Sequence, residues 1–295
     1  MYVITGATGN IGSKIVKRLL DEGQSVRMIA RNAEKMKPFE NQGGEAFPGS
    51  ADDAEFLTKA FTGAKAVFTM EPPDVTADDP RKFINDMGEK IARAIQDAGV
   101  KYVVNLSTVG AHLPDSSGFI SGLHDQENRL NQMKGINVVH LRPAYFMENL
   151  FDSMGMIKEH GMIGWTLKPD LKIPMIATED IANYAAERLM DLDFKGSEVK
   201  YLLGERDVSY NEVARVIGSK IGLPDLKYQE MPEDTVRDAM RQWGLNERTT
   251  EAFITMMDDI NSGRIYEDSK RTEETTTPTS LERFADTFAE VYKHS

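Results

Sequence analysis

The sequence has no cysteine among its 295 residues, which excludes disulfides, thiolate metal sites and cysteine nucleophiles. It also lacks any apolar run of about eighteen residues, so no segment is predicted to cross a membrane. Its five histidines show no spacing typical of metal ligands, and no Gly-x-Ser-x-Gly sequence is present. These absences argue against thiol enzymes, metalloenzymes and serine hydrolases with that nucleophile motif.

Positive charge is in deficit too. The sequence has 35 Lys and Arg residues against 47 Asp and Glu residues, which gives a formal net charge of −12. A surface this acidic repels phosphate backbones, and basic residues gather only briefly, at residues 27–37. We therefore expect no nucleic-acid partner. Residues 1–5 are too short and uncharged to form a signal peptide, so we expect a cytoplasmic protein.

Short apolar runs alternate with amphipathic stretches through the first half of the chain. The apolar runs predict buried strands, and stretches spaced like Ile11, Ile15 and Leu19 predict helices. Strands separated by helices of about ten or more residues imply right-handed crossovers and a parallel sheet. The strands are expected at residues 2–5, 25–30, 45–47, 66–70, 102–106 and 137–141, and the helices between them include residues 33–42 and 118–133.

After Pro143 this rhythm changes. Glycines and prolines at residues 155–174 indicate loops. A helix at residues 179–190 and a strand at residues 199–203 follow, and the strand is expected to rejoin the sheet. The chain from Ser209 onward is predicted to be mostly helical, with a polar, threonine-rich loop at residues 272–279.

These patterns predict an α/β fold: a Rossmann-type doubly wound parallel sheet with a smaller, mostly helical C-terminal substrate region. Residues 1–150 would form the NADP(H)-binding domain, with its sheet completed by residues 176–204. Residues 151–295 would mainly form the smaller region that covers the substrate. The cofactor assignment rests on the two features described next.

A glycine-rich loop directly follows the first strand and opens a helix, reading Thr-Gly-Ala-Thr-Gly-Asn-Ile-Gly from Thr5 to Gly12. The turn needs a residue without Cβ, the middle glycine lets a pyrophosphate approach the backbone, and the last lets the helix pack on the sheet. Backbone N–H groups at the helix N-terminus then hold the phosphate charge. The predicted dinucleotide contacts are Gly6, Thr8, Gly9, Asn10, Ile11 and Gly12.

Arg31 ends the second strand, where NAD-specific Rossmann proteins tend to place an acidic residue. A planar guanidinium can pair two oxygens of the 2′-phosphate of NADP, and Lys35 lies one helical turn further on. These two residues predict that NADP(H) is preferred over NAD(H). The alternative interpretation is that Arg31 is only a solvated charge at a strand end.

These features resemble the NmrA-like branch of the atypical short-chain dehydrogenase/reductase superfamily over nearly the whole chain. The residues that carry the resemblance are 5–12, 26–31, 106–108, 141–149 and 179–182. The branch includes NADPH-dependent quinone reductases, related small-molecule reductases and non-catalytic regulators that sense the dinucleotide. The resemblance therefore implies the cofactor more strongly than it implies any reaction.

The resemblance also implies positions for other site residues. It places Met70, Glu71 and Pro72 along the cofactor ribose, with Ser107 and Thr108 near the nicotinamide. Loops at the carboxyl ends of parallel strands are where such sheets bind ligands, which supports these positions independently. The nicotinamide ring would be lined by Pro143, Tyr145 and Phe146.

Two of the matching segments also have a simpler interpretation. Residues 141–143 are alternatively a strand end with a rigid exit. Asp180 is better explained as the first-turn acid of a helix than as a site residue.

Typical members of the superfamily carry a tyrosine and, four residues later, a lysine, but residues 118–133 contain neither. In one alignment Phe119 and Leu123 occupy the pair, and in another Ile120 and His124 do. His124 is then a candidate proton donor, or else a locally hydrogen-bonded histidine on the helix face. Ser107 is a second catalytic candidate that would bond a substrate oxygen, or else cap its loop.

Two functions follow from these residues. The first is an NADPH-dependent reductase of a small, electron-poor substrate such as a quinone, acting by hydride transfer without the tyrosine–lysine pair. The alternative is a non-catalytic NADP(H)-sensing regulator with a protein partner or an oligomeric state of its own. A sugar-nucleotide epimerase would need the missing tyrosine and ranks below both.

Overall fold

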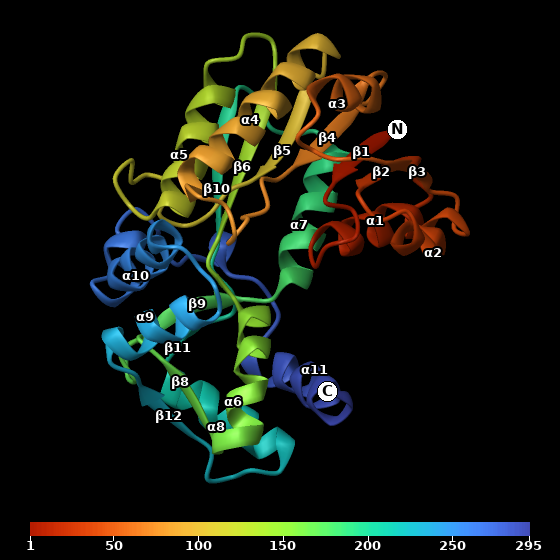
Figure 1. The fold of residues 1–295 in the computed structure, drawn as a ribbon. Helices are drawn as coiled ribbons and strands as arrows, with labels where there is room; N and C mark the ends of the chain where they lie inside the picture. The colour runs from red at the N-terminus through yellow and green to blue at the C-terminus, as the bar shows by residue number, and fades with distance from the viewer.

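The computed structural model describes residues 1–295 and is built around a seven-stranded parallel sheet (Figure 1). The strand order is β10-β6-β5-β4-β1-β2-β3, so the chain starts in the middle and winds outward in both directions. The predicted Rossmann-type fold is confirmed. The strands are β1 (Tyr2–Thr5), β2 (Val26–Ala30), β3 (Glu45–Pro48), β4 (Ala66–Thr69), β5 (Tyr102–Leu106), β6 (Asn137–Pro143) and β10 (Ser197–Leu202).

Helices cover both faces of this sheet (Figure 1). One face packs against α1 (Gly12–Asp21) and α7 (Thr178–Asp191). The other face packs against α3 (Ala54–Phe61), α4 (Pro80–Asp97) and α5 (Gly118–Asn131). Because the central strands are buried on both faces, they appear in the sequence as continuous apolar runs.

The helical stretch expected at residues 33–42 is present over residues 34–40, but as two short pieces. The chain forms a 3₁₀ turn, η1 (Glu34–Met36), and then a short helix, α2 (Lys37–Glu40). Pro38 has no N–H to donate to the preceding turn, so it sits in the first turn of a new helix instead of continuing the old one.

The C-terminal region contains two small sheets that the sequence did not predict. One has the strand order β11-β9-β7, and the other pairs β8 with β12. The loops expected at residues 155–174 are therefore replaced in large part by regular structure, and β12 interrupts the helical part. The elements are β7 (Tyr145–Phe146), η2 (Met147–Ser153), α6 (Met154–His160), β8 (Met162–Trp165), β9 (Ile173–Ile176), β11 (Asp207–Val208), α8 (Tyr210–Ile221), β12 (Lys227–Glu230), α9 (Glu233–Gln242), α10 (Glu247–Asn261), η3 (Arg264–Tyr266), η4 (Glu273–Thr275) and α11 (Leu281–His294).

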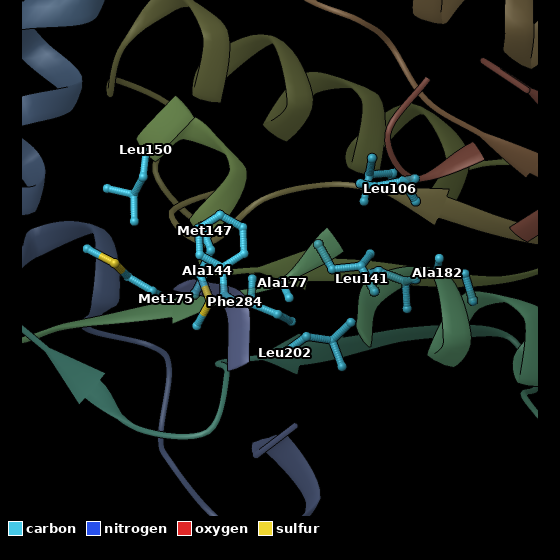
Figure 2. Packing of buried hydrophobic residues seen from close by; sticks show 14 of the residues in the cluster. Leu106, Leu141, Ala144, Met147, Leu150, Met175, Ala177, Ala182, Leu202 and Phe284 are labelled. Carbon is cyan, nitrogen blue, oxygen red and sulfur yellow. The ribbon is translucent and has the colours of Figure 1, made fainter. Parts of the chain in front are cut away.

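One hydrophobic cluster joins this region to the sheet. Figure 2 shows Leu141 and Leu202, from adjacent strands, close to Ala182 of α7. The same cluster continues through Met175 to Phe284 of α11. The C-terminal region is therefore packed against the sheet and shares its core. None of the helices combines the length and the apolar character needed to span a bilayer.

The threonine-rich segment at residues 272–279 is anchored to α7. The amide and the hydroxyl of Thr279 donate to the carboxylate of Asp180 at 3.0 and 2.7 Å. Asp180 does lie in the first turn of α7, as expected, but it is buried and its oxygens are used by this distant segment. Its main contact is thus tertiary.

Candidate cofactor and substrate site

In the loop between β1 and α1, positions 6 and 12 leave no room for a side chain. Gly6 has a φ of +61°, and the Gly9 amide donates to the Gly6 carbonyl at 2.9 Å. A Cβ on Gly12 would lie 2.2 Å from that same carbonyl oxygen. No side chain caps the N-terminus of α1, so its first amides have no side-chain acceptor. This geometry fits a bound diphosphate.

The other predicted loop contacts differ in exposure. Gly9 and Asn10 are exposed, Thr8 is half-buried, and Ile11 is buried beneath the loop. Asn10 and Thr8 can thus reach a ligand with their side chains. Ile11 can do so only through its backbone.

Arg31 lies directly after β2, next to this loop. The Ala7 amide donates to the Ile29 carbonyl at 3.1 Å, which joins the glycine loop to the end of that strand. Arg31 and Lys35 are both exposed. The pKa of Asp74 is lowered, mainly by hydrogen bonds from Thr76 and to a smaller extent by the nearby charge of Arg31. Two accessible cations therefore follow the strand end that the glycine loop contacts.

The three residues after β4, which are Met70, Glu71 and Pro72, have different surroundings. Met70 covers the glycine loop, since a Cβ on Gly6 would lie 2.6 Å from its sulfur. Glu71 is only 4% exposed, and neither of its carboxylate oxygens has a hydrogen-bond partner. Burial raises the pKa of Glu71 to about 8, although the positive charge of Arg129 opposes the shift. Pro72 is exposed.

The segment after β6 carries two half-buried aromatic side chains. Pro143 is buried at the end of that strand, and Tyr145 and Phe146 form the short strand β7. The hydroxyl of Tyr210 donates to that of Tyr145 at 3.2 Å, and burial raises the pKa of Tyr145. Both phenols therefore stay protonated at neutral pH.

Ser107 and His124, the two catalytic candidates, already have partners. The Ser107 hydroxyl is buried and donates to Glu127 at 2.5 Å, whereas Thr108 is half-exposed. The Nδ1 of His124 lies 2.8 Å from the Ala111 carbonyl, and its Nε2 lies 2.8 Å from the Asn128 amide nitrogen. Both ring nitrogens are used locally, so a catalytic role for either residue stays a prediction.

A buried ion-pair network that the sequence did not predict lies below these loops. Arg142 donates through Nε and Nη2 to the two oxygens of Glu127, at 2.9 and 2.6 Å. Its Nη1 donates to Tyr201 at 2.6 Å and to Asp268 at 2.8 Å. Burial works against the charge of Arg142, but its bonds to Glu127 outweigh burial and raise its pKa.

Part of this network had a signal in the sequence. An arginine in a buried strand needs a buried partner. Residues 141–143 are indeed a strand end with a rigid exit, and Arg142 within them is also the centre of the network. No local pattern marks Asp268, which lies 126 residues after Arg142 in the chain.

Glu148 joins the segment after β6 to the start of α7. Both of its oxygens accept the Thr178 amide at 3.0 Å, so Glu148 caps the start of α7. Lys14 of α1 also reaches Glu148 at 3.4 Å. This cluster fixes α1 against α7 below the glycine loop.

Comparisons with known proteins agree with this architecture. A family model, described as the NmrA-like family, matches residues 2–285. A (4-alkanoyl-5-oxo-2,5-dihydrofuran-3-yl)methyl phosphate reductase of Streptomyces griseus subsp. griseus is 27% identical over 240 residues, covering 81% of this chain and 80% of that protein.

Two solved structures share the fold over nearly the full length. The NADPH-dependent quinone oxidoreductase from Escherichia coli, complexed with NADPH, has a TM-score of 0.78 at 24% identity and covers 100% of this chain and 99% of its own. The Citrobacter sp. triphenylmethane reductase, complexed with NADP(H), has a TM-score of 0.79 at 21% identity, covering 98% and 99%.

Proposed function

This chain belongs to the NmrA-like family, and on that premise we propose that it is an NADPH-dependent reductase of a small, electron-poor acceptor such as a quinone. The observation that carries the proposal is the glycine loop with its uncapped helix N-terminus, next to the exposed Arg31. A similar protein is named as an NADPH-dependent quinone oxidoreductase. Hydride transfer to such an acceptor does not require the tyrosine and lysine that α5 lacks.

We assign the cofactor contacts to the loops at the carboxyl ends of the sheet strands. The diphosphate would bind at Gly6, Gly9 and Gly12, and the 2′-phosphate at Arg31 and Lys35. The glycine loop would also contact the dinucleotide through Thr8, Asn10 and Ile11. The residues after β4 (Met70, Glu71 and Pro72) would lie along the ribose. The residues that follow β5 and those that end or follow β6 would line the nicotinamide: Ser107, Pro143, Tyr145 and Phe146.

We also propose a division of labour along the chain. Residues 1–150, with residues 176–204, would bind NADP(H). The rest of residues 151–295 would cover the substrate. The half-buried Tyr145 and Phe146 lie where these two parts meet, which suits a flat, apolar acceptor.

The preference for NADP(H) has a direct test in Arg31→Ala. Removing a charged hydrogen bond to the 2′-phosphate should cost about 1.5–3 kcal/mol of binding free energy, about 10- to 150-fold in Kd. Calorimetry should show this loss for NADP(H) and little change for NAD(H). Arg93→Ala, on the exposed side of α4, is the matched control and should change neither. Equal losses for both cofactors would contradict the assignment.

The reaction itself is tested by mixing the purified protein with NADPH and a panel of quinones. Oxidation of NADPH above background should appear with at least one acceptor. The alternative function, a regulator that binds NADP(H) without turnover, is favoured by the apolar residues Phe119, Ile120 and Leu123 on α5, where a catalytic pair would lie. Tight NADP(H) binding without oxidation by any acceptor would support that alternative.

A further inference from the structure

Reduction of a quinone requires a proton as well as a hydride. The two candidates from the sequence are poorly placed to supply it, because Ser107 donates to Glu127 and both nitrogens of His124 face local partners. A proton donor needs a polar hydrogen that the fold does not already use. A donor near the nicotinamide would be a titratable side chain with a free polar atom at the carboxyl ends of β5 and β6.

His112 has this property. It lies on the loop that follows β5, one residue after a turn in which the Ala111 amide donates to the Thr108 carbonyl at 3.2 Å. Its side chain is 23% exposed, and its Nε2 is buried without any hydrogen-bond partner. A buried nitrogen with no partner is costly unless a ligand uses it.

Asp268 holds the other side of this ring. The Nδ1 of His112 lies 2.9 Å from Oδ1 of Asp268, within ion-pair distance although short of full hydrogen-bond alignment. The second oxygen of Asp268 accepts from Arg142 and from Tyr201. The carboxylate is thus fixed by residues of β6 and β10. A carboxylate on Nδ1 sets the tautomer of an imidazole and leaves Nε2 for chemistry.

The segment that leads to Asp268 includes η3, which packs against the loop that carries His112. A Cβ on Gly110 would lie 2.4 Å from Cγ1 of Ile265, so η3 packs directly on the turn before His112. The neighbouring Tyr266 is half-buried, and its hydroxyl has no partner either. Free polar atoms of His112 and Tyr266 therefore lie on two segments that meet at the ends of the sheet.

We propose that His112 delivers the proton to the reduced substrate, and that Asp268 is the positioning residue that holds its ring. This assignment rests on the proposed reductase function. The acceptor takes a hydride from NADPH, which leaves an electron pair on a quinone oxygen. The Nε2–H bond of the protonated ring breaks, an O–H bond forms on that oxygen, and the ring recovers its proton from water.

Two kinds of acceptor separate proton delivery from a structural effect. A quinone needs the proton, whereas a triarylmethane dye cation becomes neutral on taking a hydride at carbon and needs none. His112→Gln should lower kcat for a quinone about 10²-fold, the lower range for loss of general acid catalysis. The rate with the dye should not change. Asp268→Asn should give a smaller loss that is also confined to the quinone.

Two other histidine variants serve as comparisons. His160→Gln alters a ring that is 59% exposed at the end of α6, and it should affect neither acceptor. His124→Gln tests the rival assignment on α5. A loss confined to the quinone in His124→Gln but absent in His112→Gln would overturn the proposal, and so would an equal loss with both acceptors in His112→Gln.

A measurement without turnover tests the orientation of the ring. In ¹⁵N-labelled protein, His112→Gln identifies the signals of His112 by their loss. The proton of the neutral ring should be on Nδ1, facing Asp268, and Asp268→Asn should shift that signal. An unshifted signal would contradict the positioning role. If the wild type oxidises NADPH with neither acceptor, the proposed function fails and the proton assignment with it; turnover that is equal in wild type and His112→Gln rejects the assignment alone.

Discussion

The side chains on one face of β4, β5 and β6 change from apolar to polar as these strands approach the candidate cofactor site. Thr69 donates to Asn105 at 3.0 Å, and the Asn105 amide lies 3.1 Å from Nδ1 of His140. The next position along β5 and along β6 on this face is occupied by Ser107 and Arg142. Burial lowers the pKa of His140 to about 4, so the ring is neutral at physiological pH. This polar layer holds the ends of the strands under α5.

Glu71 should make the protein less stable as the pH rises. Its pKa is about 8 in the folded chain, against 4.5 for an ordinary glutamate. Below pH 4.5 both states are protonated, and between pH 4.5 and 8 only unfolding releases the proton. Glu71→Gln keeps the shape and stays neutral. It should therefore match the wild type near pH 4.5 and exceed it at pH 8 by about 2–5 kcal/mol.

Urea unfolding at several pH values measures this difference. Glu159→Gln is the matched control, because that side chain is 75% exposed and its carboxylate stays in water in the folded protein. If Glu71→Gln and the wild type had the same pH dependence, Glu71 would be ionised in the folded protein. That result would mean that water or a neighbouring group solvates it.

Individual site residues were predictable where their chemistry is local. The glycine loop has a fixed spacing and fixed neighbours, and the structure gives Gly6 and Gly12 the tight backbone contacts that the spacing predicts. The network around Arg142 was not predictable in full. Its Glu127 lies on a helix, and Asp268 is brought in only by the fold of the C-terminal region.

The junction between β1 and α1 should tolerate no side chain at Gly12. A Cβ there would lie 2.2 Å from the carbonyl oxygen and 2.7 Å from the carbonyl carbon of Gly6, and backbone atoms cannot swing aside. Gly12→Ala should therefore shift the loop, weaken NADP(H) binding about tenfold or more, and cost about 1–3 kcal/mol of stability. Cofactor titration and thermal unfolding measure both effects.

Gly155→Ala is the control for this substitution. Gly155 lies inside α6 with no atom within 4 Å of an added Cβ, so alanine should be neutral or slightly stabilising. Unchanged cofactor affinity in Gly12→Ala would show that the diphosphate does not need this close approach.

Whole elements were predictable in the sheet and less so in the C-terminal region. The central strands β1, β4, β5 and β6 are buried along nearly their whole length, so each one has a signal in its own residues. By contrast, β7 and β11 are two residues long, and each is defined by pairing with β9. A strand this short has no periodicity to detect, and its existence depends on a partner elsewhere in the chain.

At the scale of the whole molecule, the C-terminal helix returns to the sheet through Asp180. This carboxylate holds Thr279 just before Ser280, which caps α11. Phe284 of α11 then packs on Phe151 of η2, with ring centroids 5.4 Å apart. A single buried carboxylate therefore fixes where the last helix begins, and that helix completes the core of the C-terminal region.

Asp180→Ala should weaken the attachment of Thr279 and the start of α11 to α7. It leaves the amide and hydroxyl of Thr279 buried without a partner, which should cost about 2–4 kcal/mol. The neighbouring Glu179→Ala separates this contact from a helix-dipole effect, because Glu179 shares the first turn of α7 but is 51% exposed. Glu179→Ala should cost about 0.3–1 kcal/mol. Hydrogen exchange should rise at residues 272–284 only in Asp180→Ala, whereas equal effects of the two variants would mean that Asp180 acts only through its charge at the helix end.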